Sequence, residues 1–195
     1  MRIVGGKHKG RPLAAPKGRS TRPTSDRARE AMFNVLAHAE WAPPIDGARV
    51  IDLFAGSGGL GLEAMSRGAS FCLFVETEAA ARGAIRDNID ALQLFGRTRL
   101  HRRDATALGD KPSNLGAPFD IAFLDPPYGK GLGEEALARL IEGEWLSPDA
   151  IAVLEVGAEE TPLTPGWTIA TEKLYGAAKV LFLERITDTS ALDAS

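Results

Sequence analysis

Residues 50–61 read Val50-Ile51-Asp52-Leu53-Phe54-Ala55-Gly56-Ser57-Gly58-Gly59-Leu60-Gly61, an apolar run followed by a glycine-rich turn. The apolar run predicts a buried strand, and the residues that follow the turn favour a helix. Glycines in such a turn let a ligand approach the backbone closely, beside the N-terminus of the helix. This unit is typical of the first strand and helix of an open α/β sheet, which binds its ligand at the carboxyl edge of the strands.

The alternation of strand and helix patterns continues along the chain. Strands are predicted near 48–54, 70–76, 98–103, 119–125 and 150–156, and helices near 59–67, 78–93 and 132–143. Such a rhythm indicates a parallel sheet with helices on both faces. Two further strand-like runs, about 167–174 and 179–186, flank Tyr175-Gly176 and predict a terminal antiparallel pair. The expected fold is therefore an α/β sheet of seven strands.

A segment rich in Gly, Pro and basic residues precedes this alternation. Residues 1–23 are expected to form an arm, with a short hairpin around Gly5-Gly6. A helix is predicted to begin next, capped by Thr24 or Ser25. The last residues are small and polar, and we expect them to fray. The predicted organisation is a basic arm over 1–23, one domain over 24–186 and a flexible tail over 187–195.

Length and composition indicate one domain with a full-sized core, because 195 residues are 44% hydrophobic. No apolar run approaches the roughly 20 residues that cross a bilayer. The N-terminus also lacks the apolar stretch of a signal peptide. The single Cys72 lies in an apolar run, where a buried core thiol is expected. Together these features favour a cytoplasmic protein without membrane contact.

Charge is distributed unevenly along the chain. Residues 1–30 contain nine Lys or Arg and two acidic residues, whereas the remaining 165 residues contain 14 basic and 24 acidic side chains. A basic arm on an acidic body is typical of a protein with a polyanionic partner, and nucleic acid is the first candidate. A solvated tail that improves solubility is the alternative, and the charge pattern alone leaves both open.

Acidic residues end or follow the first four predicted strands, at Asp52, Glu76, Asp104 and Asp125. Because the carboxyl ends of parallel strands meet at one edge of a sheet, these carboxylates are expected to lie together. Glu76 is placed to accept hydrogen bonds from ribose hydroxyls, and Asp104 could accept one from an adenine amino group. Ordinary solvated acids at strand ends are the alternative for each residue taken singly.

A dinucleotide site is a competing reading of the glycine turn. Gly56, Gly58 and Gly61 satisfy G-x-G-x-x-G, and Glu76 lies 20 residues after Gly56. Asp52 argues against this reading, because a carboxylate just before the turn would repel a pyrophosphate and attract a cationic ligand. The chain also lacks room for the second mononucleotide half that dinucleotide enzymes usually carry.

The fourth predicted strand ends in Asp125-Pro126-Pro127-Tyr128. Two prolines stop the strand and restrict the direction of the Pro126 carbonyl. A carboxylate, a rigid carbonyl and the flat ring of Tyr128 suit a planar exocyclic amino group, since they offer two acceptors for its hydrogens and a π surface for its ring. The plain structural alternative is a proline-terminated strand with a surface tyrosine.

Several of these stretches resemble one enzyme family. D-L-F-A-G-S-G-G-L-G-L-E-A at 52–64 resembles the S-adenosylmethionine loop of class I methyltransferases, and D-P-P-Y at 125–128 resembles the motif of those that methylate exocyclic amines. R-I-V-G-G-K-H-K-G-R at 2–11 and R-P-T-S-D-R-A-R-E-A-M-F-N at 22–34 are similar to the RsmD family, bacterial enzymes that act on guanine N2 of 16S rRNA. The resemblance covers about residues 2–186.

The resemblance implies a Rossmann-like class I methyltransferase fold, S-adenosylmethionine as donor and a flipped-out guanine of 16S rRNA as acceptor. It further implies a monomer that meets the rRNA in a small-subunit ribosomal particle, without a metal ion. The implied catalytic residues are Asp125, Pro126 and Tyr128. The residues implied to bind S-adenosylmethionine are Asp52, Phe54, Gly56, Gly58, Glu76, Asp104, Ala105 and Asp125. Those implied to bind RNA are Arg2, Lys7, Lys9, Arg11, Arg22 and Arg27.

Other functions fit parts of the pattern. A DNA adenine-N6 methyltransferase shares D-P-P-Y, but such enzymes usually carry a separate recognition domain for which this chain has no room. A protein-glutamine methyltransferase usually opens the motif with Asn. An RNA-binding module with a vestigial site is opposed by the intact Asp52, Glu76 and Asp125. A nicotinamide oxidoreductase is the function that a dinucleotide site at the glycine turn would imply.

Overall fold

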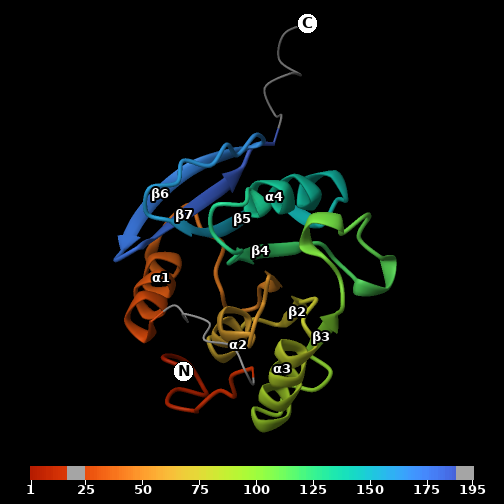
Figure 1. Cartoon of the computed structure of the whole chain (residues 1–195). Coiled ribbons are helices and arrows are strands. Elements are labelled where there is room, and N and C mark those ends of the chain that lie inside the picture. The colour runs from red at the N-terminus through yellow and green to blue at the C-terminus, as the bar shows by residue number, and fades with distance from the viewer. Residues whose placement is uncertain (17–24, 188–195) are drawn as a thin grey trace, which may run out of the picture.

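The computed structural model describes residues 1–16 and 25–187, in which seven strands form one sheet in the order β3-β2-β1-β4-β5-β7-β6 (Figure 1). The strands are β1 (Arg49–Leu53), β2 (Phe71–Val75), β3 (Thr98–His101), β4 (Phe119–Leu124), β5 (Leu146–Gly157), β6 (Trp167–Tyr175) and β7 (Ala178–Arg185). Strands β1 to β5 are parallel, and β7 and β6 add an antiparallel pair next to β5. The predicted α/β sheet with its terminal antiparallel pair is confirmed.

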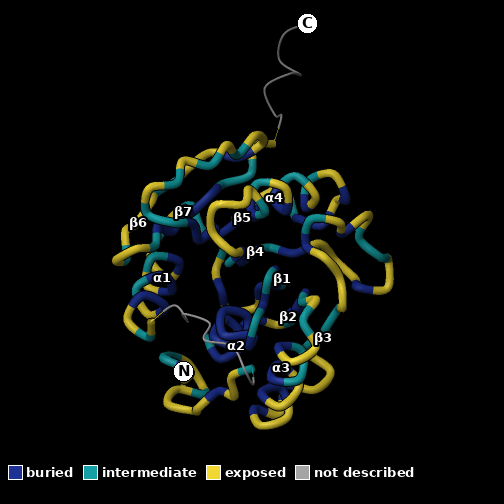
Figure 2. The backbone as a smooth tube through the Cα atoms, in the orientation of Figure 1, coloured by how far each residue is buried: buried dark blue, intermediate teal, exposed yellow. Residues whose placement is uncertain are grey.

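Helices cover both faces of the sheet, as predicted. They are α1 (Asp26–His38), α2 (Gly59–Ser66), α3 (Ala79–Ala91) and α4 (Leu132–Glu142), with short 3-10 turns η1 (Ala105–Ala107) and η2 (Ser113–Leu115). Alternate strand residues face opposite ways, so Val50 packs in a core with α1, α2 and α3, whereas Ile51 packs in a core with α4. Figure 1 shows α4 across the sheet from α1 and α2. Every residue of α2 is buried (Figure 2).

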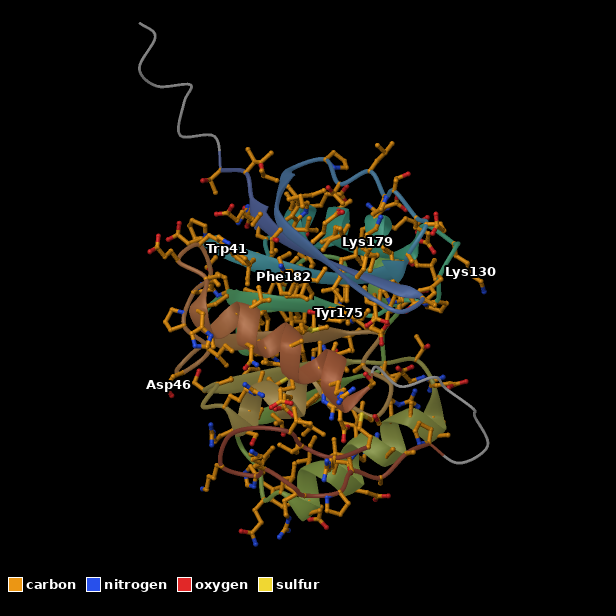
Figure 3. All side chains as sticks on the ribbon, turned by 90° about the vertical axis from the view of Figure 1, so that its left-hand side faces the viewer. Trp41, Asp46, Lys130, Tyr175, Lys179 and Phe182 are labelled. Atoms are coloured by element: carbon orange, nitrogen blue, oxygen red, sulfur yellow. The ribbon has the colours of Figure 1, made fainter. Side chains whose placement is uncertain are left out.

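Helix α1 begins where the capping signal predicts. The Ser25 side chain accepts a hydrogen bond from the Ala28 amide at 3.1 Å, while Thr24, the other candidate cap, lies outside the described residues. Beyond the helix, the Trp41 ring lies 5.9 Å from that of Phe182 in β7, centroid to centroid (Figure 3). The helix and the loop after it therefore cover the part of the sheet that includes the antiparallel pair.

Two strand boundaries differ from the prediction. Strand β3 ends at His101, although the prediction extended it to 103. It is an edge strand that pairs only with β2, so no second strand supplies hydrogen bonds to continue it. Strand β5 begins at Leu146, before 150, and contains a register shift ahead of Ile151. Polar and proline residues around Pro148 concealed this early start, because proline has no amide hydrogen to donate to a ladder.

The described part of the predicted basic arm is a hairpin folded onto the domain. Arg2 and Pro12 form an antiparallel bridge, and the Ile3 side chain is fully buried. The Lys7 amide donates to the Ser66 carbonyl at the C-terminal end of α2, at 2.7 Å. Gly6 permits this approach, since a Cβ there would lie 2.0 Å from the Ser66 oxygen. The hairpin was predicted around Gly5-Gly6, whereas its docking along α2 was not.

Buried charges join this hairpin to α1 and α2. Arg29 is 1% exposed and Glu63 is fully buried. The Arg29 guanidinium donates to Asp26 at 3.0 Å and to the backbone carbonyl of Arg2, and its Nε lies 3.7 Å from the Glu63 carboxylate. Glu63 also accepts hydrogen bonds from the Val4 amide at 2.9 Å and from Arg67 at 2.8 Å. These contacts give Arg29 and Glu63 a structural role.

The sequence also made predictions about Cys72, about membrane-spanning helices and about the C-terminal tail. Cys72 is buried, as predicted. No helix among the described residues is long and apolar enough to cross a membrane. The flexible tail was predicted over 187–195, of which 188–195 lie outside the described residues.

Candidate active site

Carboxylates from four strands gather at the carboxyl edge of the sheet, on the face covered by α1, α2 and α3. The register pairs Leu124 of β4 with Leu154 of β5, so the residues that follow them, Asp125 and Glu155, are also neighbours. The register of β1 with β2 and β4, together with the alternation of side chains along each strand, places Asp52 of β1 and Glu76, just after β2, on this face as well. The sequence predicted three of these four acids, and Glu155 is the addition.

Asp52 lies beneath the first turn of α2. It is 2% exposed, and its carboxylate accepts a hydrogen bond from the Gly61 amide at 2.9 Å. Burial raises the pKa of Asp52 well above its usual range; the Gly61 hydrogen bond opposes the rise, and the charges of Asp125 and Glu76 add to it. Only glycine fits at 61, where a Cβ would lie 2.5 Å from the Phe74 ring. Asp52 therefore braces the strand-turn-helix unit from inside.

The glycine turn has an unusual backbone. Phe54, Gly56 and Gly58 all have positive φ angles, of 58°, 58° and 82°. For Phe54, which has a side chain, this conformation costs on the order of 1–3 kcal/mol, and such residues cluster at functional sites. No atom lies within 4 Å of the position that a Cβ on Gly56 would take, so the space beside that residue is open. A ligand can approach the backbone there, as the glycine pattern indicated.

Glu76 holds the turn in place. One carboxylate oxygen accepts the Gly56 amide at 2.8 Å, and the other accepts the Glu78 amide, also at 2.8 Å. A carboxylate offers about four lone-pair positions, so Glu76 retains acceptor capacity after both hydrogen bonds. It is partly exposed at the end of β2. A role in binding ribose hydroxyls stays a prediction that this geometry accommodates.

Asn88 of α3 ties the turn to the N-terminal hairpin. Its side-chain nitrogen donates to the carbonyl oxygens of Ser57, at 3.0 Å, and of Ala14, at 3.1 Å, while its oxygen accepts the Ala14 amide at 2.7 Å. Asn88 is 2% exposed, so this hydrogen bonding is internal. Sequence reasoning missed this residue because its partners are 31 and 74 positions away, and no local pattern connects them.

Asp104 and Ala105 follow β3 at the same edge of the sheet. Asp104 is exposed and caps η1: one carboxylate oxygen accepts from the Thr106 amide at 2.8 Å and from the Thr106 hydroxyl at 2.7 Å. These hydrogen bonds lower the pKa of Asp104. Ala105 is buried in the core on the α4 side. Contacts of these two residues with a nucleobase remain predictions.

The segment after β4 brings an acid and an aromatic ring together. Asp125 is half-buried, and Tyr128 is 44% exposed. Burial and, secondarily, the negative charge of Glu155 raise the pKa of Asp125 to about 7. The Tyr128 hydroxyl donates a hydrogen bond to Glu155, and burial followed by that contact raises the pKa of Tyr128. Asp125 can therefore change its protonation state near neutral pH.

A small pocket adjoins this segment, lined by residues including Pro126, Tyr128, Leu154, Glu155 and Glu160. Pro126 is buried, and the Gly129 amide donates to Glu160 at 2.7 Å, which fixes the loop beyond Tyr128. Glu155 could have been found from the sequence, since it ends an apolar run as Asp125 does. Like Asp52 and Asp125, Glu155 is an acid near the carboxyl end of a parallel strand, here the fifth.

The residues predicted to bind RNA fall into three groups. Arg2 pairs with Asp26 at 3.0 Å, and the Arg11 guanidinium donates to a backbone carbonyl at 3.1 Å, so both already serve the fold. Lys7, Lys9 and Arg27 are exposed and form no ion pair within residues 1–16 and 25–187. Arg22 lies outside the described residues. Sequence reasoning did not single out Lys130, an exposed residue two positions after Tyr128 in the chain, which lies at the periphery of the domain (Figure 3).

Known proteins are similar to this chain in sequence and in fold. A family described as "Conserved hypothetical protein 95" matches residues 1–184. The Escherichia coli K12 protein named ribosomal RNA small subunit methyltransferase D is 37% identical over 187 residues, covering 95% of this chain and 90% of the relative. The Haemophilus influenzae protein of the same name is 34% identical over 178 residues, covering 90% of this chain and 89% of the relative.

A solved structure of the Escherichia coli protein yhhF superimposes with a TM-score of 0.79 at 36% sequence identity, covering 95% of this chain and 97% of that one. This likeness supports a Rossmann-like class I methyltransferase fold over nearly the whole chain. The family resemblance predicted from residues 2–11, 22–34, 52–64 and 125–128 is confirmed. The chain belongs to the Conserved hypothetical protein 95 family, the RsmD family.

Proposed function

We propose that this protein transfers a methyl group from S-adenosylmethionine to the exocyclic N2 amine of a guanine in small-subunit rRNA. The observation that carries the proposal is the position of Asp125 and Tyr128 at the same sheet edge as the glycine turn, beside a pocket. The names of the relatives support rRNA as the substrate. The Asp125–Tyr128 segment suits an exocyclic amine. Guanine N2 is the exocyclic amine that the resemblance to the RsmD family implies.

The cofactor side of the site suits a ligand that combines positive charge with ribose. S-adenosylmethionine, when bound, supplies an electrophilic methyl group on a positively charged sulfur. Asp52, Glu76 and Asp125 place three carboxyl groups at one edge, and the charges of Asp125 and Glu76 oppose the ionisation of Asp52. A cation at this edge would relieve that repulsion, whereas a pyrophosphate would increase it. This contrast disfavours the dinucleotide alternative, and Glu76 with the open backbone at Gly56 provides room and an acceptor for ribose.

Replacement of Glu76 by Ala is expected to weaken S-adenosylmethionine binding by about tenfold to a hundredfold. A charge-assisted hydrogen bond contributes roughly 1.5–3 kcal/mol, and the variant also frees the Gly56 amide that the carboxylate holds. Isothermal titration calorimetry measures the change. Glu78→Ala is the control, because Glu78 engages Glu76 through its backbone amide, which the substitution retains. Unchanged affinity in a folded Glu76→Ala protein would refute the assignment.

On the acceptor side, the chain's own groups would orient the amine. The lone pair of guanine N2 is delocalised into the ring, so the amine is a poor nucleophile until it is held in a reactive geometry. Hydrogen bonds to Asp125 and to the Pro126 carbonyl would direct the lone pair, mainly through positioning and electrostatics. Tyr128 would stack on the extruded base, an interaction worth about 1–3 kcal/mol.

The proposed activity is tested by mass spectrometry of nucleosides from small-subunit rRNA of cells with and without the gene. We expect deletion to remove one N2-methylguanosine and the intact gene to restore it. A gene encoding Asp125→Asn, made at the same level, should not restore it. Loss of N6-methyladenine from DNA instead would favour the DNA methyltransferase alternative, and unchanged methylation in both polymers would favour an RNA-binding module.

The two lysines of the hairpin, Lys7 and Lys9, offer positive charge that the folding of the hairpin does not need. Its backbone and apolar side chains hold it to the domain, as the Lys7 amide and buried Ile3 show, so the Lys7 and Lys9 ammonium groups remain at the surface. Lys7 contacts Ser66, at the opposite end of α2 from the glycine turn. Eight helical residues span about 12 Å, so an RNA bound there would extend along the domain beyond its target base.

RNA affinity should therefore depend steeply on salt. Each phosphate neutralised contributes a slope of about −0.7 to −0.9 in log K against log salt. Replacing Lys7, Lys9 and Arg11 by Ala should therefore flatten the slope by about two to three units if all three side chains contact phosphate. Fluorescence anisotropy with labelled rRNA at several salt concentrations provides the measurement. Lys173→Ala, an exposed lysine on the distant edge strand β6, is the control and should leave the slope unchanged.

Parallel lines for the wild type and the triple variant would mean that the hairpin does not bind phosphate. S-adenosylmethionine affinity should be equal in both proteins, because the glycine turn and its acids lie at the other end of α2. A loss of cofactor affinity in the triple variant would instead indicate that the hairpin had lost its fold, through Ala14 and Asn88.

A further inference from the structure

Glu155 is a buried acid that contacts the acceptor side of the site and has no role in the proposed methyl transfer. It lies in β5, is 6% exposed and accepts a hydrogen bond from the Tyr128 hydroxyl. The register between β4 and β5 also places it beside Asp125, on the same face of the sheet. One buried carboxylate therefore contacts the aromatic ring of the acceptor site through the hydroxyl, and adjoins the acid of that site.

We propose that Glu155 is a positioning residue of the acceptor site, which holds the Tyr128 ring in place and sets the charge of Asp125 through its own negative charge. The inference rests on the proposed function, since it names what organises the groups that meet the amine. The alternative is that Glu155 is a buried acid with a purely structural role. This alternative predicts that only stability changes when Glu155 is replaced.

The first half of the proposal follows from the freedom of Tyr128. Tyr128 is 44% exposed, so packing covers only part of it, and the loop around it contains Gly129 and Gly131. The hydroxyl contact with Glu155 gives the far end of the ring a fixed partner on the rigid strand β5. A stacking surface held in advance lowers the entropic cost of receiving a base.

The second half follows from the charges that surround Asp125. Glu155 faces it from β5, Asp52 from β1, and Tyr128 and Glu160 belong to the adjoining loops. Asp52 is itself buried, and burial favours its neutral form. Among the described residues, Glu155 is therefore the neighbour whose charge most directly opposes ionisation of Asp125. Asp125 accepts hydrogen bonds from an amine best when it is ionised, so its protonation sets the acid limit of the activity.

In the wild type, the pKa of Asp125 is raised to about 7, so activity should rise with pH through a midpoint near that value. Glu155→Gln removes the opposing charge and keeps a side-chain oxygen that can accept from Tyr128. The midpoint should then move to lower pH by about one unit, less than half of the rise from 3.8 to about 7, because burial is the larger cause of that rise. Glu159→Gln, an exposed acid in the next loop, is the matched control and should leave it in place.

A second pair of variants separates the contribution of the Tyr128 hydroxyl from that of the Glu155 carboxylate. Tyr128→Phe keeps the ring and loses the hydroxyl, and Glu155→Ala keeps the hydroxyl and loses its acceptor. If Glu155 acts on the ring through that contact, both variants should raise KM for rRNA by a similar factor, about threefold to tenfold. Tyr128→Ala should raise it further, because the stacking face is lost as well. Only Glu155→Ala should also move the pH midpoint downwards.

The test uses the full chain, with the 13C resonance of the Asp125 carboxyl followed by NMR across pH in the wild type, Glu155→Gln and Glu159→Gln. This titration needs neither cofactor nor RNA, so it stands even if rRNA is not the substrate. We expect a lower midpoint in Glu155→Gln alone. An unchanged midpoint would overturn the electrostatic role, and an unchanged KM in both Tyr128→Phe and Glu155→Ala would overturn the positioning role. Absence of methyl transfer to rRNA by the wild type would instead refute the proposed function.

Discussion

Replacement of Asp125 by Asn is expected to reduce the turnover of rRNA methylation by about 10²- to 10⁴-fold, the range seen when an orienting or charge-stabilising group is removed. Asn retains one acceptor oxygen but carries no charge, and its NH2 group would oppose an incoming amine with a donor. Single-turnover transfer of labelled methyl to rRNA, at saturating cofactor, isolates this step from binding. A variant that keeps more than about a tenth of the rate would exclude the orienting role, since that loss is only about 1.4 kcal/mol in the barrier.

The same substitution should leave the fold intact. Burial and Glu155 raise the pKa of Asp125 to about 7, above its value in an unfolded chain. The ionised form is therefore disfavoured in the folded protein, and the wild type loses stability as the pH rises from about 4 towards 7. Asn cannot ionise, so the variant should lack this part of the pH dependence and be at least as stable as the wild type at pH 8. Urea unfolding at pH 5 and pH 8 provides the comparison.

Replacement of Arg29 by Ala is expected to cause a large loss of stability, about 3–5 kcal/mol in the free energy of unfolding. The guanidinium is 1% exposed, donates to the backbone of Arg2 and to Asp26, and lies 3.7 Å from the buried carboxylate of Glu63. Its removal leaves Glu63 buried with one cation fewer, and it removes one of the contacts between the hairpin and α1. Such a loss is a large part of the 5–15 kcal/mol typical of a domain.

Arg27→Ala is the matched control, because Arg27 lies in the same helix two positions earlier and is exposed. Its effect should stay within about 0.5 kcal/mol. If Arg29→Ala does not fold, Arg29→Met retains the apolar stem and should give an intermediate loss. Equal stabilities for Arg29→Ala and Arg27→Ala in urea titrations would show that the buried ion cluster contributes nothing to the fold.

The architecture of the sheet could be predicted because its signals are local. Apolar runs mark the strands, the glycines near Gly58 mark the first turn, and closely spaced strands mark the antiparallel end. Parallel strands share one carboxyl edge, so the positions of Asp52, Glu76 and Asp125 along the chain were enough to bring them together in space. The start of β5 was misplaced because polar residues interrupt the apolar pattern there.

The tertiary structure decided which of these groups are partners. The pairing of Tyr128 with Glu155 spans 27 residues, and that of Asn88 with Ala14 spans 74, so neither leaves a periodic trace in the chain. The basic charge of residues 1–16 was visible in the sequence, but the docking of that hairpin along α2 depends on buried contacts such as those of Glu63. Periodicity and strand ends are local properties that a sequence displays. Side-chain partners and shifted pKa values depend on burial and on charges from distant segments, which only the folded chain brings together.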